Sequence, residues 1–192
     1  MKKLVISAGD PAGIGPDICI KAFGRKKNLN YSPVIFGDPE IFEERAKLLG
    51  CSIDIQEYKG EDSGKISKDS LWIEPFFIRK RVKPGEPDPS YAKYLMDILE
   101  HAISRTMKGE FSGLVTGPIN KELINKAGIK FQGHTEVLSK LSNSPKVLMM
   151  LASGNLKVAL ATIHLPLKEV PEAITYEHIE DCINILNENL KT

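Results

Sequence analysis

The chain has 192 residues, of which 42% are apolar and 27% are charged, an ordinary composition for a soluble globular protein. Its formal net charge of +1 gives no electrostatic reason to expect nucleic acid or an anionic membrane as a partner. No apolar run approaches the roughly 20 residues that a membrane helix needs. The cysteines, Cys19, Cys51 and Cys182, are odd in number and widely spaced, which favours a reducing cytoplasm over a disulfide framework.

Strand and helix patterns alternate from Leu4 to Leu123. The first two strands, Leu4–Ser7 and Pro33–Gly37, are short β-branched runs typical of buried parallel strands. Asp38 follows the second strand and is expected to cap the next helix. Further strands are expected over Ile53–Tyr58 and Leu71–Ile78, and a long helix over residues 90–107. This order predicts an α/β fold with a mainly parallel sheet.

Two turns rich in glycine and proline follow predicted strands. The first is Gly9–Pro16, and the second is Gly117-Pro118, which ends the short strand Gly113–Thr116 and precedes a helix pattern at Ile119, Leu123 and Ile124. In α/β proteins such turns present backbone N–H groups to an anion at the carboxyl edge of the sheet. Two ordinary strand-to-helix turns would explain the pattern as well. The Gly-x-Gly-x-x-Gly dinucleotide fingerprint is absent.

The pattern changes after Leu138. Two apolar runs, Val147–Ala152 and Leu156–Thr162, flank Ser153-Gly154-Asn155 and predict an antiparallel hairpin. The second strand is expected to end at Ile163-His164-Leu165-Pro166, and a final helix follows it.

Three side chains at element boundaries are the best candidates for a site: His134, Thr135 and His164. A histidine after a strand is more often a hydrogen-bonded packing residue than a metal ligand, and one imidazole does not make a metal site. No Gly-x-Ser-x-Gly motif and no cysteine pair occurs. The residues alone therefore predict an α/β ligand-binding protein.

Four stretches together add a resemblance to a known family. They are GDPAGIGP (Gly9–Pro16), VTGPINK (Val115–Lys121), AGIKFQGHTE (Ala127–Glu136) and MMLASGNLKVALATIHLPL (Met149–Leu167). In content, order and spacing they resemble the 4-hydroxythreonine-4-phosphate dehydrogenases of pyridoxal phosphate biosynthesis. The resemblance implies a fold like the isocitrate and isopropylmalate dehydrogenases, with two α/β domains, only partly present here because the family's chain is longer. Residues 1–125 would form an incomplete first domain, completed from beyond the chain end, and residues 126–192 would begin the second.

The same resemblance implies a metal-dependent oxidation and decarboxylation of 4-phosphooxy-L-threonine to 3-amino-2-oxopropyl phosphate, linked to NAD or NADP. It implies a divalent metal (Zn, Mg or Co) held by three histidines, and a homodimer with the active site at the interface. Position by position, His134 and Thr135 match the family's substrate contacts, and His164 matches its first metal histidine. Two rivals are a dehydrogenase of threonate or erythronate 4-phosphate, and a non-catalytic binding or dimerising fragment.

Overall fold

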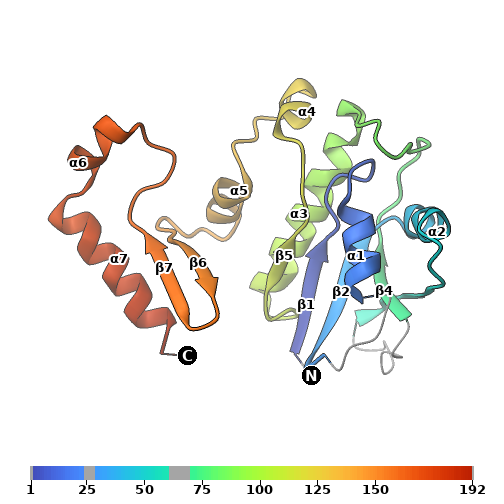
Figure 1. Cartoon of the computed structure of the whole chain (residues 1–192), viewed down its shortest axis with the longest axis horizontal. Coiled ribbons are helices and arrows are strands. Elements are labelled where there is room, and N and C mark those ends of the chain that lie inside the picture. Colours follow the sequence, from blue (N-terminus) through green and yellow to red (C-terminus); the bar gives the residue numbers. More distant parts are fainter. Residues whose placement is uncertain (1, 24–28, 61–69, 192) are drawn as a thin grey trace. The chain divides into compact units, whose positions relative to one another are not determined.

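The computed structural model describes residues 2–23, 29–60 and 70–191. These residues form two compact units, one reaching to Asn143 and the other starting at Ser144 (Figure 1). The predicted domain boundary after residue 125 refers to the domains of a longer two-domain protein and stays a prediction.

The first unit is built on a five-stranded parallel sheet with strand order β3-β4-β2-β1-β5. Its strands are β1 (Lys2–Ser7), β2 (Tyr31–Gly37), β3 (Asp54–Glu57), β4 (Ser70–Pro75) and β5 (Leu114–Thr116). The predicted α/β class with a parallel sheet is therefore confirmed. β1 lies between β2 and β5, with Val5 opposite both Val34 and Leu114.

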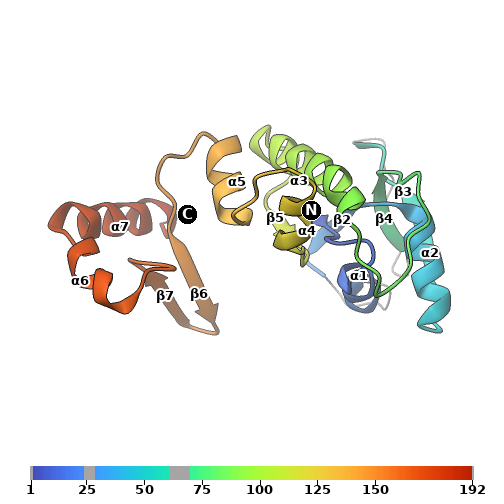
Figure 2. The same ribbon diagram turned by 90° about the horizontal axis from the view of Figure 1, so that it is seen from above.

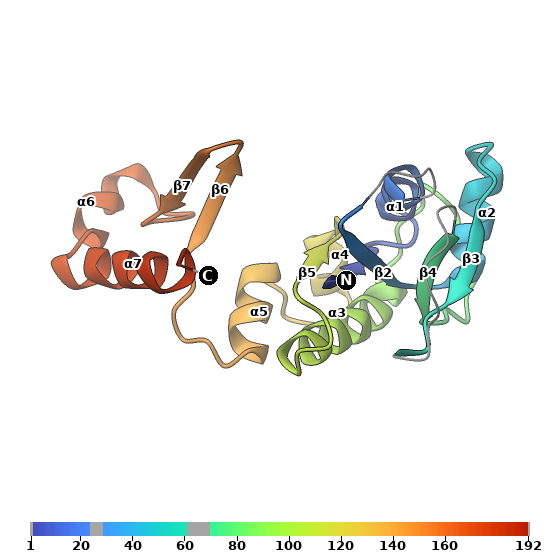
Figure 3. The same cartoon turned by 90° about the horizontal axis from the view of Figure 1, so that it is seen from below.

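Helices cover both faces of this sheet, because successive side chains of a strand point to opposite faces. Ile6 packs with Ile20 of α1 (Gly15–Phe23) and Phe42 of α2 (Pro39–Leu48), whereas the adjacent Val5 packs with Ile98 of α3 (Ala92–Met107). Figures 2 and 3 show α1 on one side of the sheet and α3 on the other. Each fully buried large side chain of this kind stabilises the fold by about 1.5–3 kcal/mol relative to exposure.

Asp38 caps α2, as predicted, and it does more than cap. Its Oδ1 accepts a hydrogen bond from the backbone N–H of Glu40 at 3.0 Å, and its Oδ2 accepts one from Ile78 at 2.8 Å. The carboxylate is almost fully buried. One side chain thus fixes both the start of α2 and the segment that leaves β4.

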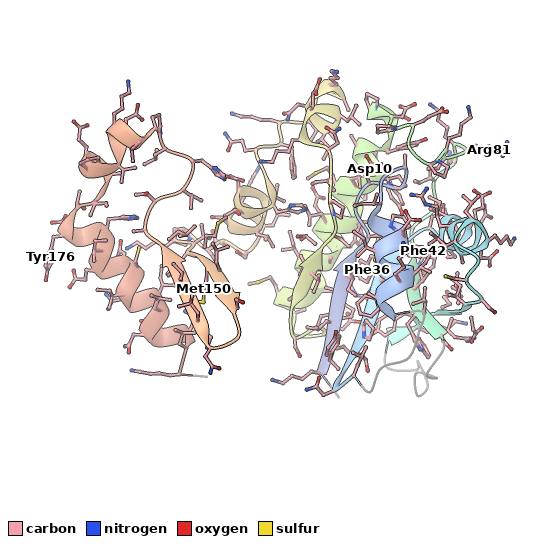
Figure 4. The ribbon with its side chains drawn as sticks, in the orientation of Figure 1. Asp10, Phe36, Phe42, Arg81, Met150 and Tyr176 are labelled. Atoms are coloured by element: carbon pink, nitrogen blue, oxygen red, sulfur yellow. The ribbon has the colours of Figure 1, made fainter. Side chains whose placement is uncertain are left out.

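The second unit contains the predicted antiparallel hairpin, formed by β6 (Met149–Ser153) and β7 (Leu156–Leu160). Gly154 in its turn has a φ of +54°, a conformation that glycine adopts without strain. The hairpin is followed by a short 3-10 turn over Leu167–Glu169, by α6 (Val170–Ala173) and by α7 (Tyr176–Asn189). Figure 4 labels Met150 on β6 and Tyr176 at the start of α7.

The strand prediction here was too long, because β7 ends at Leu160 rather than at His164. β6 begins at Met149, which pairs with Leu160, so no residue of β6 remains to pair with the segment that follows. The carbonyl of Ala161 instead contacts the ring Nε2 of His178 on α7. In the part of the chain that the structure describes, no helix has the length and apolarity to span a membrane.

Candidate active site

The two glycine-proline turns meet at the carboxyl edge of the sheet. β1 and β5 are parallel neighbours with Ser7 opposite Thr116, so the segments that follow them emerge side by side. The N–H of Gly117 donates to the Ser7 carbonyl at 2.7 Å, and the N–H of Asp10 donates to the Pro118 carbonyl at 2.9 Å. The two turns therefore lie in contact at the edge where the sequence predicts a site.

Glycine is required where the turns touch. A Cβ on Gly9 would lie 2.3 Å from the Pro118 oxygen, and a Cβ on Gly117 would lie 2.5 Å from the Ala8 oxygen. Real Cβ atoms do not approach oxygen so closely, and Gly9 also has a φ of +81°. The two turns therefore form one interlocked structure rather than two independent loops.

A cavity of about 560 Å³ opens over the interlocked turns. Asp10 (labelled in Figure 4), Ile14 and Lys121 contribute side chains to its wall, and Gly13 contributes backbone. The Asp10 carboxylate is nearly buried and accepts a hydrogen bond from the Ala12 N–H at 2.9 Å, whereas the Ile14 side chain is 63% exposed. The cavity thus combines an exposed apolar surface, a carboxylate and an ammonium group. Its volume lies in the range usual for ligand sites, roughly 300–1,000 Å³.

A buried arginine that the sequence analysis missed supports the first turn. The Arg45 guanidinium on α2 donates to the Gly13 carbonyl and pairs with the Asp17 carboxylate at 2.8 Å. Its side chain is 8% exposed, so the charge is shielded from water. No local sequence signal marks Arg45, because its partners lie in another element.

The helix after the second turn begins later than predicted. α4 covers Lys121–Lys126, so Ile119 lies before it, and Asn120 caps it by accepting from the N–H groups of Glu122 and Leu123. At the other end, the Asn125 side-chain amide exchanges two hydrogen bonds with the backbone of Phe131, at 2.9 and 3.0 Å. These bonds fix the path of the chain from α4 to Phe131.

His134 and Thr135 form the start of α5 (His134–Leu141), and both are half-buried. The His134 ring packs edge-on against Phe131, with centroids 5.9 Å apart, and lines a small pocket with Ser7, Gly9 and Ile124. Burial, and secondarily the charge of Lys121, lower the pKa of His134 from its ordinary value of 6.5. The ring is therefore neutral at pH 7.

His164, the third predicted site residue, lies in the second unit. It follows β7 in a bend, is exposed and has a φ of +56°, which is uncommon for a residue other than glycine. Its ring makes no hydrogen bond with the residues that the structure describes. Residues 2–23, 29–60 and 70–191 contain no group of three His, Cys, Asp or Glu side chains placed to hold a metal ion.

Comparison with known proteins decides the family. The family model described as pyridoxal phosphate biosynthetic protein PdxA matches residues 30–192. The chain belongs to the PdxA family. The resemblance that the four motifs indicated is thereby confirmed.

Two curated relatives and one solved structure give the extent of the similarity. The 4-hydroxythreonine-4-phosphate dehydrogenase of Saccharophagus degradans is 39% identical over 98% of this chain and 56% of its own length. That of Yersinia pseudotuberculosis is 40% identical over 99% of this chain and 57% of its own length. The crystal structure of the Klebsiella pneumoniae enzyme has a TM-score of 0.91 at 24% identity, covering all of this chain and 60% of the other, which shows a common fold. The chain thus spans just over half the length of these PdxA relatives.

Proposed function

We propose that the protein containing this chain oxidises and decarboxylates 4-phosphooxy-L-threonine to 3-amino-2-oxopropyl phosphate, a step of pyridoxal phosphate biosynthesis. The observation that carries the proposal is membership of the PdxA family over residues 30–192, with relatives named for this dehydrogenase. Those relatives favour phosphohydroxythreonine over threonate or erythronate 4-phosphate as the substrate. The nearly neutral net charge of the chain, +1, supports a small-molecule partner rather than nucleic acid.

His134 and Thr135 are proposed to bind and orient the substrate. The neutral His134 ring has one N–H donor and one free nitrogen acceptor, and the Thr135 hydroxyl can donate or accept. Neither side chain hydrogen-bonds to another residue in the described part of the chain, so both groups are free to contact a ligand. The Asn125–Phe131 bonds hold the backbone three residues before His134, which limits reorganisation on binding.

His164 is proposed as one ligand of a divalent metal ion (Zn, Mg or Co), and NAD or NADP as the oxidant. An exposed imidazole with no hydrogen-bond partner among the described residues suits one coordination position, and at least two further donors are needed. The cavity over the glycine-rich turns, with exposed Ile14 on its wall, suits part of a dinucleotide. When bound, the metal would polarise the substrate's hydroxyl oxygen and the nicotinamide would accept its hydride.

A homodimer is proposed as the active form, with the active site at the interface. In the hairpin register, Leu151 lies opposite Val158, and Leu156 is two residues from Val158, so the three share one face. All three are exposed, from 43% to 65%. A row of exposed apolar side chains supports the expectation that a second subunit covers this face. We also place the protein in the cytoplasm, in line with its three free cysteines.

The test is replacement of His164 by Ala in the full-length protein, assayed for metal-dependent NADH formation from 4-phosphooxy-L-threonine. The variant should lose this activity and bind less metal. His101→Gln is the matched control, because His101 is exposed on α3 and contacts the ring of Phe76. Full activity of the His164→Ala variant would contradict the ligand role. A wild-type protein that forms NADH only from threonate or erythronate 4-phosphate would contradict the substrate.

A further inference from the structure

Lys121 lines the cavity over the turns and also reaches the start of α5. It lies directly after the Asn120 cap, so the position of its Cα is fixed by the helix start. The neighbouring Glu122 pairs with Lys126 at 2.6 Å. Lys121 itself is exposed and forms no ion pair with a carboxylate among the residues that the structure describes.

Gly133 leaves the space that the Lys121 ammonium group enters. A Cβ built on Gly133 would lie 3.3 Å from Lys121 Nζ and 2.8 Å from Glu136 Oε2. The φ of Gly133 is 167°, an extended conformation that any residue can adopt, so backbone strain does not explain a glycine here. The ends of the Glu136 and Lys121 side chains occupy the space that a Cβ would need, which favours a glycine here.

The ends of the Lys121 and Glu136 side chains therefore lie beside Gly133, next to His134 and Thr135 at the start of α5. Among the described residues, the side chains of Lys121, His134 and Thr135 have no hydrogen-bond or ion-pair partner. Burial first, and then the charge of Lys121, lower the pKa of His134, as follows from an ammonium group near the ring. A cation next to neutral donor groups can bind a phosphate or carboxylate. Glu136 is exposed, so its carboxylate can turn into the solvent when an anion binds there. The proposed substrate carries both anions.

We propose that Lys121 is a further substrate-binding residue, whose ammonium group pairs with an anionic group of the ligand held by His134 and Thr135. The anion is the phosphate or the carboxylate of the substrate, and the ammonium group would bind either in the same way. This inference rests on the proposed function for the identity of the substrate. It does not depend on the metal or on the dinucleotide.

The kinetic test compares Lys121→Met with Lys121→Arg and Lys140→Met in the full-length protein. Lys140 is exposed in the last turn of α5, and its replacement controls for loss of one positive charge. Lys121→Met should raise KM by about tenfold to a hundredfold, the range expected for loss of one charge-assisted hydrogen bond. Lys121→Arg should recover part of the loss, and Lys140→Met should leave KM unchanged. An unchanged KM in Lys121→Met would overturn the proposal.

Inhibition by simple anions then distinguishes the two sources of negative charge. If Lys121 binds the phosphate, Lys121→Met weakens competitive inhibition by inorganic phosphate and leaves inhibition by malonate as it was. If Lys121 binds the carboxylate, the opposite pattern follows. Equal inhibition of wild type and variant by both anions would overturn the proposal.

A binding measurement keeps the inference separate from the proposed function. In NMR spectra of the full-length protein, inorganic phosphate or malonate should shift the His134 ring signals saturably in the wild type and far more weakly in Lys121→Met. If the wild type does not oxidise phosphohydroxythreonine but shows this Lys121-dependent shift, the anion site stands and the proposed function falls. Shifts of equal affinity in wild type and Lys121→Met would exclude Lys121 as the anion-binding cation.

Discussion

Replacing Gly9 by Ala tests whether the two turns of the candidate site are interlocked. The new methyl group would lie 2.3 Å from the Pro118 oxygen, on the other turn. The same change at Gly109 is a matched control, because the φ angles are nearly equal, +81° and +80°, and nothing lies within 4 Å of a Cβ at Gly109. The two variants therefore share the backbone penalty and differ in the steric contact.

The expected loss of stability can be built from these two parts. Placing an L-residue in the left-handed region costs about 1–2 kcal/mol at either site. Both variants also gain the same small benefit from a less flexible unfolded chain, about 0.4–1 kcal/mol. The contact with Pro118 adds about 1–3 kcal/mol at Gly9 alone, the usual cost of overpacking a rigid site. Gly9→Ala should thus be less stable than Gly109→Ala by about 1–3 kcal/mol.

Urea unfolding of the full-length protein, followed by circular dichroism, measures this difference directly. Substrate KM should also change in Gly9→Ala and not in Gly109→Ala, because the separated turns carry Asp10 and Lys121 apart. Equal free energies of unfolding for the two variants would show that the turns can move apart without a loss of stability. That result would refute the interlocked arrangement.

Two substitutions and one pH series test further interactions in the first unit. Arg45→Met should destabilise the protein by about 3 kcal/mol, because it leaves the Asp17 carboxylate unpaired. Adding Asp17→Asn should recover part of that loss. Urea unfolding of the two single variants and the double variant measures both effects. Asp38→Ala should cost about 2–3 kcal/mol by removing the α2 cap and leaving the Ile78 N–H without its acceptor, and Asp38→Asn should cost less in the same assay. The pKa of His134 is lower in the folded protein than in the unfolded chain, so its neutral ring contributes stability above about pH 6.5 that is lost as the pH falls toward the folded pKa. Thermal melts between about pH 7.5 and pH 5 should show this loss in the wild type and a smaller one in His134→Gln.

The sequence predicted those parts of the fold that depend on local pattern. Buried strands such as Leu4–Ser7, the Asp38 cap and the hairpin turn at Gly154 each carry their signal within a few residues. The strand order has no such local signal in the sequence. β5 lies beside β1 although three other strands separate them in the chain, and only the folded sheet places the turn after β5 against the turn after β1.

The candidate site residues that the sequence marks are likewise those with a local pattern. His134 and Thr135 were identified because Gly133-His134-Thr135 opens an element, and the motif resemblance assigned them a role. Arg45 was missed because its partners, Gly13 and Asp17, belong to a turn and a helix distant in sequence. The strand into His164 was predicted too long because apolar residues continue past Leu160, while the pairing register ends there.

The residues of the candidate site fall into two groups: those whose polar groups are hydrogen-bonded within the protein, and those whose polar groups can bind a ligand. The main-chain and side-chain groups that shape the edge are already paired: Asp10 with Ala12, Asn120 with the first turn of α4, and Asn125 with Phe131. These bonds hold the turns and the helix start in place, so they contribute rigidity to the edge. The Lys121 side chain has no hydrogen-bond or ion-pair partner in the described ranges, so its ammonium group must be ordered when a ligand binds, at a cost of up to about 2 kcal/mol in side-chain entropy. An anionic ligand can offset that cost and a neutral one cannot, so this edge of the sheet should discriminate between substrates by charge.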